Sequence, residues 1–584
     1  MSEPDSTRWQ HTRVLWHFVR PHRRTLLLGL VLGLGTTGAT LATPLVTKSV
    51  LDGLAVSAPI LPAVVLLVSL LLVGAGLGLA QWILLGRLAE RIVLDARSTM
   101  VHRLFRVRVG ELANRPSGEL VTRVTSDTVL LREAATDSVV NFVNGAVALA
   151  GALILMGVLD WVLLTGTVIV LIVVGTVVAI LMSPLADAQR NAQAAVGRLG
   201  GVLEGALRAI RTVKASRAEA RESNRILTEA KESARQSVRA VRIEAVAWTT
   251  ASWGIQLAIL LILALGAWRV SSGALPVSSL VAFLLYAFQV MEPVSTLTRT
   301  FTQLQSGIAA AARIKEIENL SIEQTEPLAR EPEPAAQAPV LSFREVTARY
   351  APGAPAALDG VNLDIPRTGH TAIVGPSGSG KTTMFSLMLR FLQPEHGELA
   401  LDGTGYEQWS LAEVRRRIVY VEQDTPLLPG TLRENLQYTH PDATEADLWT
   451  ALEAVQLAER ARTLPDGLDT VLSGSVVSGG ERQRIALARA LVSDPEILLL
   501  DEATAQLDGL TEAAVQDVIA RVARRGAVVT IAHRLSTVLD ADQILLLEKG
   551  KRRALGNHAH LLENDELYRD LVAALRIAPV TSAA

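Results

Sequence analysis

A glycine-rich stretch at residues 372–383 has the composition needed to hold a chain of phosphates. Its sequence, AIVGPSGSGKTT, matches the pattern G-x-x-x-x-G-K-[ST] in full, from Gly375 through Lys381 to Thr382. The apolar run before it predicts a strand and the run TTMFSLMLRFL after it predicts a helix, which is the context that this pattern requires. Glycines let backbone N–H groups surround phosphate oxygens, and the start of a helix adds positive potential. The stretch therefore predicts a nucleoside triphosphate site.

Two side chains of this loop can act on the nucleotide directly. The Lys381 ammonium can reach the β- and γ-phosphates, and the Thr382 hydroxyl can ligate Mg²⁺. ATP and Mg²⁺ are thus the expected cofactors. The loop residues that we expect to bind them are Gly375, Pro376, Ser377, Gly378, Ser379, Gly380, Lys381, Thr382 and Thr383.

A pair of carboxylates follows a second apolar run, in the sequence ILLLDEAT at 497–504. Four consecutive apolar residues fit a buried parallel strand. The end of that strand would direct Asp501 toward Mg²⁺ and Glu502 toward an attacking water, with Glu502 as general base. An acidic pair after a strand usually forms a turn, but the phosphate-binding loop about 120 residues earlier favours the catalytic interpretation.

A second anion site is predicted at VSGGERQRIALARAL, residues 477–491. Ser478, Gly479 and Gly480 precede a helical pattern, so exposed N–H groups and a hydroxyl would lie together at a helix start. One nucleotide does not need two such sites from one fold. We therefore expect this surface to meet the γ-phosphate held by another subunit; the alternative is a simple N-capped helix.

The element pattern around these motifs separates a membrane half from a soluble half. The chain has 584 residues, a net charge of −2, no cysteine and 49% hydrophobic residues, and the mean hydropathy is +0.31. This charge argues against a nucleic-acid partner, and the absence of cysteine excludes disulfides and thiolate metal sites.

The membrane half is predicted to contain six membrane spans. Each predicted span has at least 22 uncharged residues, where roughly 20 suffice. The six predicted spans are 25–47, 54–86, 138–159, 161–186, 245–268 and 270–291.

Basic residues predict the orientation of these spans in the cytoplasmic membrane. Segment 87–137 holds nine Arg, and segment 187–244 holds twelve Arg or Lys. The connections on the other side, around 47–60, Asp160 and 269–277, offer only Lys48 and Arg269. Because positive charge stays on the cytoplasmic side, both termini and both long segments are expected there.

The two basic segments keep helical spacing, so they are expected to be extensions of the spans and not ordinary charged loops. The second helix is predicted from about 61 to 107, or ~70 Å. Further extensions are predicted at 187–210 and 218–244, with breaks near 109–117 and 209–215. The predicted parts are an interfacial helix at 1–24, a transmembrane domain at 25–320, a linker at 321–339, a nucleotide-binding domain at 340–575 and a tail at 576–584.

With these motifs, nearly the whole chain resembles the ABC transporter family, specifically its exporter-type half-transporters. The resemblance implies an all-α six-helix transmembrane domain followed by an α/β P-loop NTPase domain. It implies that Tyr350 stacks on adenine and that Gln423 links Mg²⁺ and water to the membrane domain. It also implies that Asp508 belongs to the D-loop, that His533 contacts the γ-phosphate, and that the breaks near 109–117 and 209–215 are coupling helices.

Three features depart from the family pattern. The signature ends in Glu481 where the family often has Gln, although Ser478 and both glycines are intact. The D-loop begins with Ala505 and Gln506 in place of two small residues. The stretch 470–476 is shorter than usual and lacks a Glu that is common there in exporters. These departures concern contacts between subunits and leave the hydrolytic residues in place.

The resemblance and the motifs together predict ATP-dependent export or flipping of hydrophobic or amphipathic drugs, lipids or peptides. One phosphate-binding loop and one signature per chain require two chains, either a homodimer or a pair with a related half-transporter. An importer and a regulatory or channel-like protein on the same fold remain alternatives, whereas six spans argue against a soluble ABC ATPase. The absence of an evident intramembrane charge argues against a strongly charged solute and favours an apolar or amphipathic cargo. The polar and aromatic residues that could face cargo are Gln81, Trp82, Asn141, Asn144, Trp248, Trp253, Gln256, Tyr286, Phe288 and Gln289.

Overall fold

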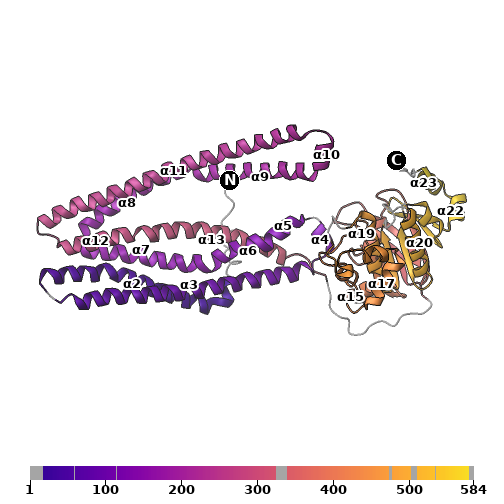
Figure 1. Cartoon of the computed structure of the whole chain (residues 1–584), viewed down its shortest axis with the longest axis horizontal. Helices are drawn as coiled ribbons and strands as arrows, with labels where there is room; N and C mark the ends of the chain where they lie inside the picture. The colour runs from indigo at the N-terminus through magenta and orange to yellow at the C-terminus, as the bar shows by residue number, and fades with distance from the viewer. Residues whose placement is uncertain are drawn as a thin grey trace. The chain divides into compact units, whose positions relative to one another are not determined.

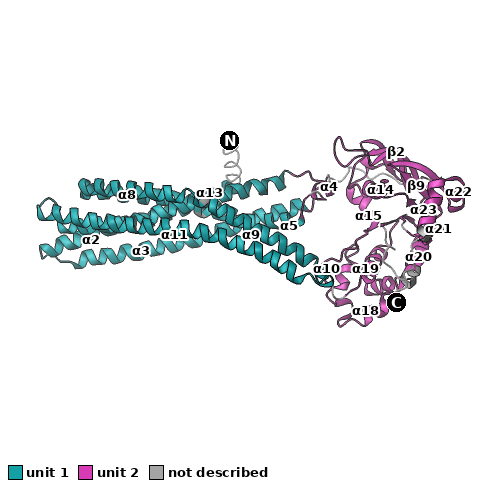
Figure 2. Cartoon of the chain, turned by 90° about the horizontal axis from the view of Figure 1, so that it is seen from above, with its two compact units in different colours: residues 1–104, 117–319 teal, residues 105–116, 320–584 magenta. Residues whose placement is uncertain are grey.

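The computed structural model describes residues 18–57, 59–113, 115–323, 338–472, 477–501, 509–532 and 534–577. They form two compact units (Figure 2). The first contains residues up to 104 and 117–319, and the second contains 105–116 and the chain from 320 onward. The predicted interfacial helix at 1–24, the linker and the tail lie largely outside the described residues, so these boundaries stay predictions.

The first unit consists of long helices (Figure 1). Six of its described helical stretches are long and apolar enough to cross a membrane, which confirms the predicted number of spans. Helix α2 packs along α3, and α9 packs along α11 with α10 at the turn between them. The helices are α2 (Arg23–Ala55), α3 (Leu61–Leu104), α5 (Ser117–Thr122), α6 (Thr128–Arg132), α7 (Val139–Leu159), α8 (Trp161–Met182), α9 (Leu185–Arg208), α10 (Ile210–Ala215), α11 (Glu219–Ser271), α12 (Val277–Gln289) and α13 (Met291–Glu318); a 3₁₀ turn covers Arg20–His22, and π-helical turns cover Arg123–Asp127 and Glu133–Ser138.

The predicted helical extensions are confirmed. Helix α3 has 44 residues, so it is ~66 Å long and about twice the hydrocarbon thickness. Helices α9 and α11 cover the predicted extensions after the fourth span and before the fifth, and α10 occupies the predicted second break. A further extension was not predicted: α13 continues the last span to Glu318.

The boundary between the fifth and sixth spans was predicted wrongly. Arg269 was placed in a connection, and the sixth span was placed at 270–291, but α11 continues to Ser271 and α12 begins only at Val277. The Arg269 guanidinium donates to Asp160 Oδ2 at 2.6 Å, and the Asp160 side chain also caps α8. An arginine whose charge is neutralised by a partner does not need to end an apolar helix.

The second unit contains two sheets. A four-stranded antiparallel sheet has the order β2-β1-β4-β5, and a six-stranded sheet has the order β10-β9-β3-β8-β7-β6. In the larger sheet all neighbours are parallel except β10 and β9. The strands are β1 (Leu341–Ala348), β2 (Leu358–Ile365), β3 (Gly369–Val374), β4 (His396–Leu401), β5 (Thr404–Gly405), β6 (Ile418–Val421), β7 (Ile497–Asp501), β8 (Ala527–Ile531), β9 (Gln543–Glu548) and β10 (Lys551–Gly556).

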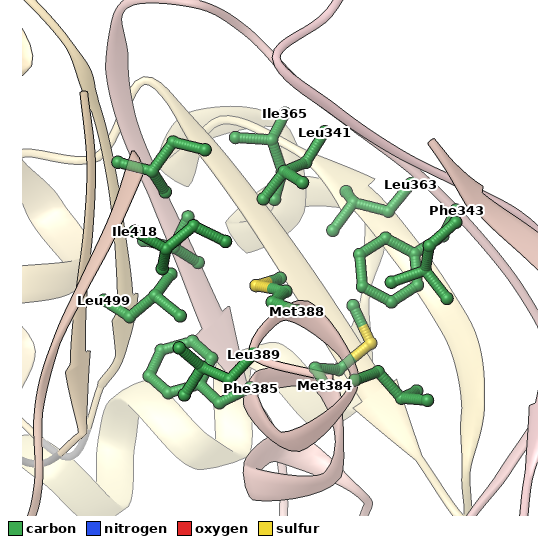
Figure 3. Close-up of a cluster of buried hydrophobic side chains, with 14 of the residues drawn as sticks. Leu341, Phe343, Leu363, Ile365, Met384, Phe385, Met388, Leu389, Ile418 and Leu499 are labelled. Atoms are coloured by element: carbon green, nitrogen blue, oxygen red, sulfur yellow. The ribbon is translucent and has the colours of Figure 1, made fainter. Parts of the chain in front are cut away.

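Two groups of helices cover opposite faces of the larger sheet. Leu498 and Leu500 of β7 pack with one group, whereas Ile497 and Leu499, which alternate with them, pack with α14. Figure 3 shows α14 among side chains from both sheets. The described helices of the whole second unit are α4 (Val109–Ala113), α14 (Lys381–Met388), α15 (Leu411–Arg417), α16 (Leu432–Leu436), α17 (Glu445–Ala454), α18 (Ala458–Arg462), α19 (Gly479–Val492), α20 (Gly509–Ala523), α21 (Leu535–Leu539), α22 (His558–Asn564) and α23 (Glu566–Ile577), with 3₁₀ turns at Tyr406–Gln408 and Gly467–Asp469.

Segment 105–116, which includes the first predicted break, belongs to the second unit. Val107 forms an antiparallel bridge with Ile322, and the Arg108 N–H donates to the Ser321 carbonyl at 3.0 Å. The neighbouring Glu323 carboxylate accepts two hydrogen bonds from Arg415 of α15, at 2.7 and 2.8 Å. Backbone pairing and a bidentate ion pair therefore hold the beginning of the predicted linker between this segment and α15.

Candidate nucleotide site and membrane cavity

The glycine-rich loop connects β3 to α14, as the sequence predicts. Gly375, Gly378 and Gly380 have φ values of +156°, +75° and +99°. A Cβ atom at Gly380 would lie 2.5 Å from the Ala357 carbonyl oxygen, and at Gly375 it would lie 2.3 Å from that of Leu547. Both the left-handed backbone and the close neighbours therefore require glycine, and the loop keeps its N–H groups uncovered for an anion.

The polar side chains of the loop fit a phosphate group. The buried Lys381 ammonium donates to the carbonyl oxygens of Gly375 at 2.9 Å and Pro376 at 3.0 Å, so it lies against the loop. The Ser379 hydroxyl is buried and has no hydrogen-bond partner among the residues that the structure describes. A cation and an unsatisfied hydroxyl beside a helix start are what a polyphosphate can use.

Tyr350 lies next to this helix although it is about 30 residues earlier in the sequence. Its hydroxyl is 3.2 Å from the Thr383 hydroxyl, and 61% of the residue is exposed. Thr383 is buried, whereas Thr382 is exposed and free to face a metal ion. An exposed aromatic ring beside the loop has a face available for a base.

Asp501 is at the same edge of the sheet as the loop. It pairs with Ile531 of β8, which pairs with Ile373 of β3 on its other side. Two strand spacings separate Asp501 from β3, which is about 10 Å. The Tyr420 hydroxyl donates to Asp501 Oδ2 at 3.4 Å. Burial, together with the Asp501 charge, raises the pKa of Tyr420, so the phenol stays a neutral donor at physiological pH.

Tyr420 was missed in the sequence. It lies on β6, and it contacts α14 through an edge-to-face pair with Phe385, with ring centroids 6.0 Å apart. A polar residue inside a short buried strand beside the Asp501 strand is the signal that could have identified it. Gln423 follows the same strand by two residues and is exposed. The loop, Asp501 and Gln423 thus lie at one carboxyl edge of parallel strands, where ligands bind in open α/β sheets.

Three predicted site residues, Glu502, Asp508 and His533, lie outside the described residues, and their placement stays a prediction. The described residues that directly precede Glu502 and His533 lie at the carboxyl edge of the larger sheet. Asp501 is the last residue of β7, and Ala532 after β8 donates its N–H to the Ile373 carbonyl at 3.1 Å.

The predicted second anion site is the start of α19, with Ser478 as its N-cap. Ser478 Oγ accepts from the Glu481 N–H at 3.2 Å, and the Glu481 carboxylate accepts from the Ser478 N–H at 2.7 Å and from Arg460 at 2.9 Å. Burial alone would raise the pKa of Glu481, but these bonds from Ser478 and Arg460 hold it below its usual value. Glu481 thus completes a capping box.

The structure does not bring the start of α19 together with the glycine-rich loop. Helices α14 and α19 pack on opposite faces of β7. Ser478, Gly479 and Gly480 therefore belong to a different side of the larger sheet from Lys381.

The membrane unit has a cavity of 520 Å³ between α2, α3, α7 and the α12–α13 segment. Five of the ten predicted cargo-facing residues line it: Gln81, Asn141, Asn144, Phe288 and Gln289. The other five do not. Trp82, Trp248, Trp253 and Gln256 are exposed elsewhere on the helices, and Tyr286 is fully buried, with its hydroxyl bonded to the Leu41 carbonyl.

Comparison with known proteins agrees with this architecture. The family model described as ABC transporter transmembrane region matches residues 26–294, and the model described as ABC transporter matches residues 358–505. The chain is 32% identical to the ATP-dependent lipid A-core flippase of Thiobacillus denitrificans, over 98% of this chain and 99% of that protein. This chain belongs to the ABC transporter family.

Other members of the family extend this result. The ABC transporter is 29% identical to a multidrug resistance ABC transporter ATP-binding and permease protein of Lactococcus lactis, over 97% of this chain and 96% of that one. A solved bacterial Atm1-family ABC exporter with ATP bound superposes with a TM-score of 0.76 at 25% identity, and covers 96% of this chain and 99% of that chain. The protein is thus a multi-pass membrane half-transporter whose ATPase domain couples ATP hydrolysis to transport.

Proposed function

We propose that this ABC transporter is a homodimeric exporter that moves hydrophobic or amphipathic compounds out of the cytoplasm, or flips them across the cytoplasmic membrane. The observation that carries the proposal is the separation of two phosphate-binding elements within one chain. The glycine-rich loop starts α14, and the Ser478 cap starts α19 on the opposite face of the sheet. The loop of one copy holds the γ-phosphate, and the Ser478 surface of a second copy completes the binding site around it.

The proposed roles at this site follow from the chemistry of each side chain. Lys381 and the loop N–H groups bind the phosphates, and Tyr350 stacks on adenine. Thr382, Gln423 and Asp501 would hold Mg²⁺, which supplies charge neutralisation between the β- and γ-phosphates. Tyr420 orients the Asp501 carboxylate through its hydroxyl.

Hydrolysis is assigned to residues around the γ-phosphate. Glu502 accepts a proton from the attacking water, and His533 and Gln423 orient water and phosphate. Asp508 contacts the same region from the partner copy. A well-placed general base is worth about 10²–10⁴ in rate.

Transport follows because ATP contacts both copies only when the two nucleotide-binding domains close. The segment at 105–116 pairs with Ile322, and the neighbouring Glu323 is bound by Arg415 of α15. Closure therefore pulls this segment, and the long helices change the membrane domain from inward-open to outward-open. A shift of the conformational ratio from 1:99 to 99:1 requires about 5.5 kcal/mol of differential binding. Two sandwiched nucleotides are the proposed source, and hydrolysis resets the cycle.

Complementation between two inactive variants tests the shared site. Lys381→Ala removes the ammonium from each loop, and Ser478→Arg blocks each signature surface. Each variant alone is expected to lose ATPase activity. Mixed dimers restore part of it, because one of their two composite sites is then intact. If mixing restores nothing while crosslinking shows that mixed dimers form, each chain completes its own site and the proposal is wrong.

The direction of transport and the role of Glu502 as general base are tested in reconstituted vesicles. With the ATPase domains outside, an exporter accumulates a labelled amphiphile in the lumen on addition of Mg-ATP, and an importer depletes it.

Glu502→Gln is expected to bind ATP, to stay closed and to lose turnover by about 10²-fold or more. Undiminished hydrolysis by this variant would refute the role given to Glu502.

A further inference from the structure

The polar wall of the membrane cavity contains one carboxylate. Glu292, in the first turn of α13, lines the 520 Å³ cavity beside Phe288 and Gln289. Within the described part of the chain, the lining residues include no other ionisable group. The Glu292 carboxylate has no ion pair or hydrogen bond with any described residue, and it is exposed. An unpaired negative charge therefore faces the space that the proposed function assigns to cargo.

Helix length places this charge within the sixth span. The apolar part of that span begins at Val277, and roughly 20 residues from there reach about residue 296. Glu292 is 15 residues from Val277, or about 22 Å along a helix, which is within a hydrocarbon thickness of ~30 Å. Ionisable residues at such depth face a water-filled pathway and mark the site of a ligand or an ion.

Among the other polar groups of this wall, the amides of Gln81, Asn141 and Asn144 can donate or accept, whereas two threonines of α2 offer only acceptors. The Thr36 and Thr40 hydroxyls donate to the carbonyls of Leu32 and Thr36, four residues before each, at 3.1 and 3.0 Å. Their hydrogens are used within α2, so toward the cavity these oxygens can only accept. The Gln289 amide nitrogen donates to the Thr40 carbonyl at 3.4 Å.

Two amide oxygens of the same wall, Asn144 Oδ1 and Gln289 Oε1, have no donor among the residues that the structure describes. Both oxygens are buried within the wall and are not open to the cavity. The acceptors that a cargo can reach are the Glu292 carboxylate and the Thr36 and Thr40 hydroxyls, and a cargo with N–H groups can donate to them. Phe288 adds an aromatic ring that is 56% exposed next to these groups, and an aromatic face attracts a cation.

We infer that the cargo carries a positively charged nitrogen with N–H donors on an apolar body, and that Glu292 is the residue that selects its charge. A protonated amine or a guanidinium group has this chemistry. An anionic head group would meet the Glu292 carboxylate, and two like charges repel each other. The inference rests on the proposed function, because it names the class of cargo for that transport cavity.

Equilibrium binding to the full chain in nanodiscs tests this assignment. The probes are dansylcadaverine, which has a primary ammonium, and its N-acetyl derivative, which has the same body without charge, followed by further amphipathic amines with matched acetylated partners. Binding is followed by fluorescence anisotropy in the absence of nucleotide. The wild-type chain is expected to bind the amines about tenfold more tightly than their acetylated partners, or ~1.4 kcal/mol.

Three variants assign this preference to one residue. Glu292→Gln is expected to abolish the preference while it still binds the acetylated probes, which shows that its cavity is folded. Glu292→Asp keeps the charge and is expected to keep most of the preference. Glu244→Gln removes an exposed carboxylate of α11 that does not line the cavity, and it is expected to bind as the wild type does.

Two outcomes overturn the inference. One is equal binding of amines and acetylated partners by the wild-type chain, and the other is an unchanged preference in Glu292→Gln. Vesicle transport separates this failure from that of the proposed function. Export of uncharged or anionic amphiphiles without charge preference would contradict the role of Glu292 and leave the exporter intact. A Glu292-dependent preference in binding without any ATP-driven flux would contradict the exporter and leave the cation site intact.

Discussion

The glycine-rich loop and the membrane cavity would hold their proposed ligands by different means. The loop is a contiguous run of residues whose backbone shape is fixed by positive φ values and by the carbonyls of Ala357 and Leu547 against its glycines. The cavity is built from side chains of α2, α3, α7 and the α12–α13 segment, and two amide oxygens of its lining residues have no partner in the described chain.

This difference indicates how each site tolerates change. Apart from the Lys381 ammonium and the Thr382 hydroxyl, the expected ligand groups of the loop are main-chain N–H groups, so a substitution of a glycine acts through backbone strain and affects several contacts at once. In the cavity each contact belongs to one side chain, so a substitution changes one contact and leaves the helices in place. Nucleotide recognition should therefore be all-or-none, whereas cargo recognition should be adjustable residue by residue.

A glycine-to-alanine substitution in the loop gives the largest expected effect. Gly380→Ala places a Cβ 2.5 Å from the Ala357 carbonyl oxygen at a φ of +99°. Strain and collision together are expected to weaken ATP binding by about 100-fold, or ~2.7 kcal/mol, in a fluorescent-nucleotide titration. Gly378→Ala is the matched control, because its φ is +75° but no heavy atom lies within 4 Å of its Cβ. Equal losses in both variants would mean that the left-handed backbone, and not the collision, dominates.

A glycine in the cavity wall gives a smaller expected effect. A Cβ at Gly33 would lie 1.9 Å from Asn144 Nδ2 and 2.8 Å from Gln81 Nε2. Both are ends of rotatable side chains, so Gly33→Ala displaces amides and keeps α2, where alanine is the better helix former by about 1 kcal/mol. We expect a folded protein whose affinity for the amine probes changes severalfold in the nanodisc assay. Gly38→Ala on the same helix meets no atom within 4 Å and should bind as the wild type does. Unfolding of Gly33→Ala would show that the cavity is as rigid as the loop.

The same contrast decides how much of the molecule could be predicted. The glycine-rich loop, the β7 strand before Asp501 and the Ser478 helix start each depend on neighbours within a few residues in sequence. Local backbone chemistry was therefore enough to place them, as it was for the six spans and for α3. Tyr420 was missed because its importance comes from β6 lying beside β7 and from the contact with Asp501, and strand order cannot be read from a short apolar run.

The cavity charge was missed for a related reason. The sixth span was predicted as the uncharged stretch 270–291, because Arg269 bounds that stretch at its start and Glu292 bounds it at its end. Pairing of Arg269 with Asp160, 109 residues earlier in the sequence, lets α11 continue to Ser271 and moves the next span toward the C-terminus. Glu292 then falls inside that span. One ion pair between distant residues thus accounts for the shift of a span boundary that the sequence alone placed elsewhere.

The signature residue Glu481 gives the smallest expected effect and tests whether a helix start depends on its backbone or on this side chain. Glu481→Gln keeps an oxygen that can accept from the Ser478 N–H, so the capping box is retained. It loses the ion pair with Arg460, whose side chain is 48% exposed, and a pair of this kind is worth about 0.5 kcal/mol. We expect ATPase activity within about twofold of the wild type, and a slightly lower melting temperature. Glu481→Ala removes the capping oxygen as well and should cost about 1 kcal/mol more. If Glu481→Gln lowers ATPase activity as strongly as Gly380→Ala lowers ATP binding, the carboxylate itself contacts nucleotide or the partner copy, and the capping explanation of this departure is wrong.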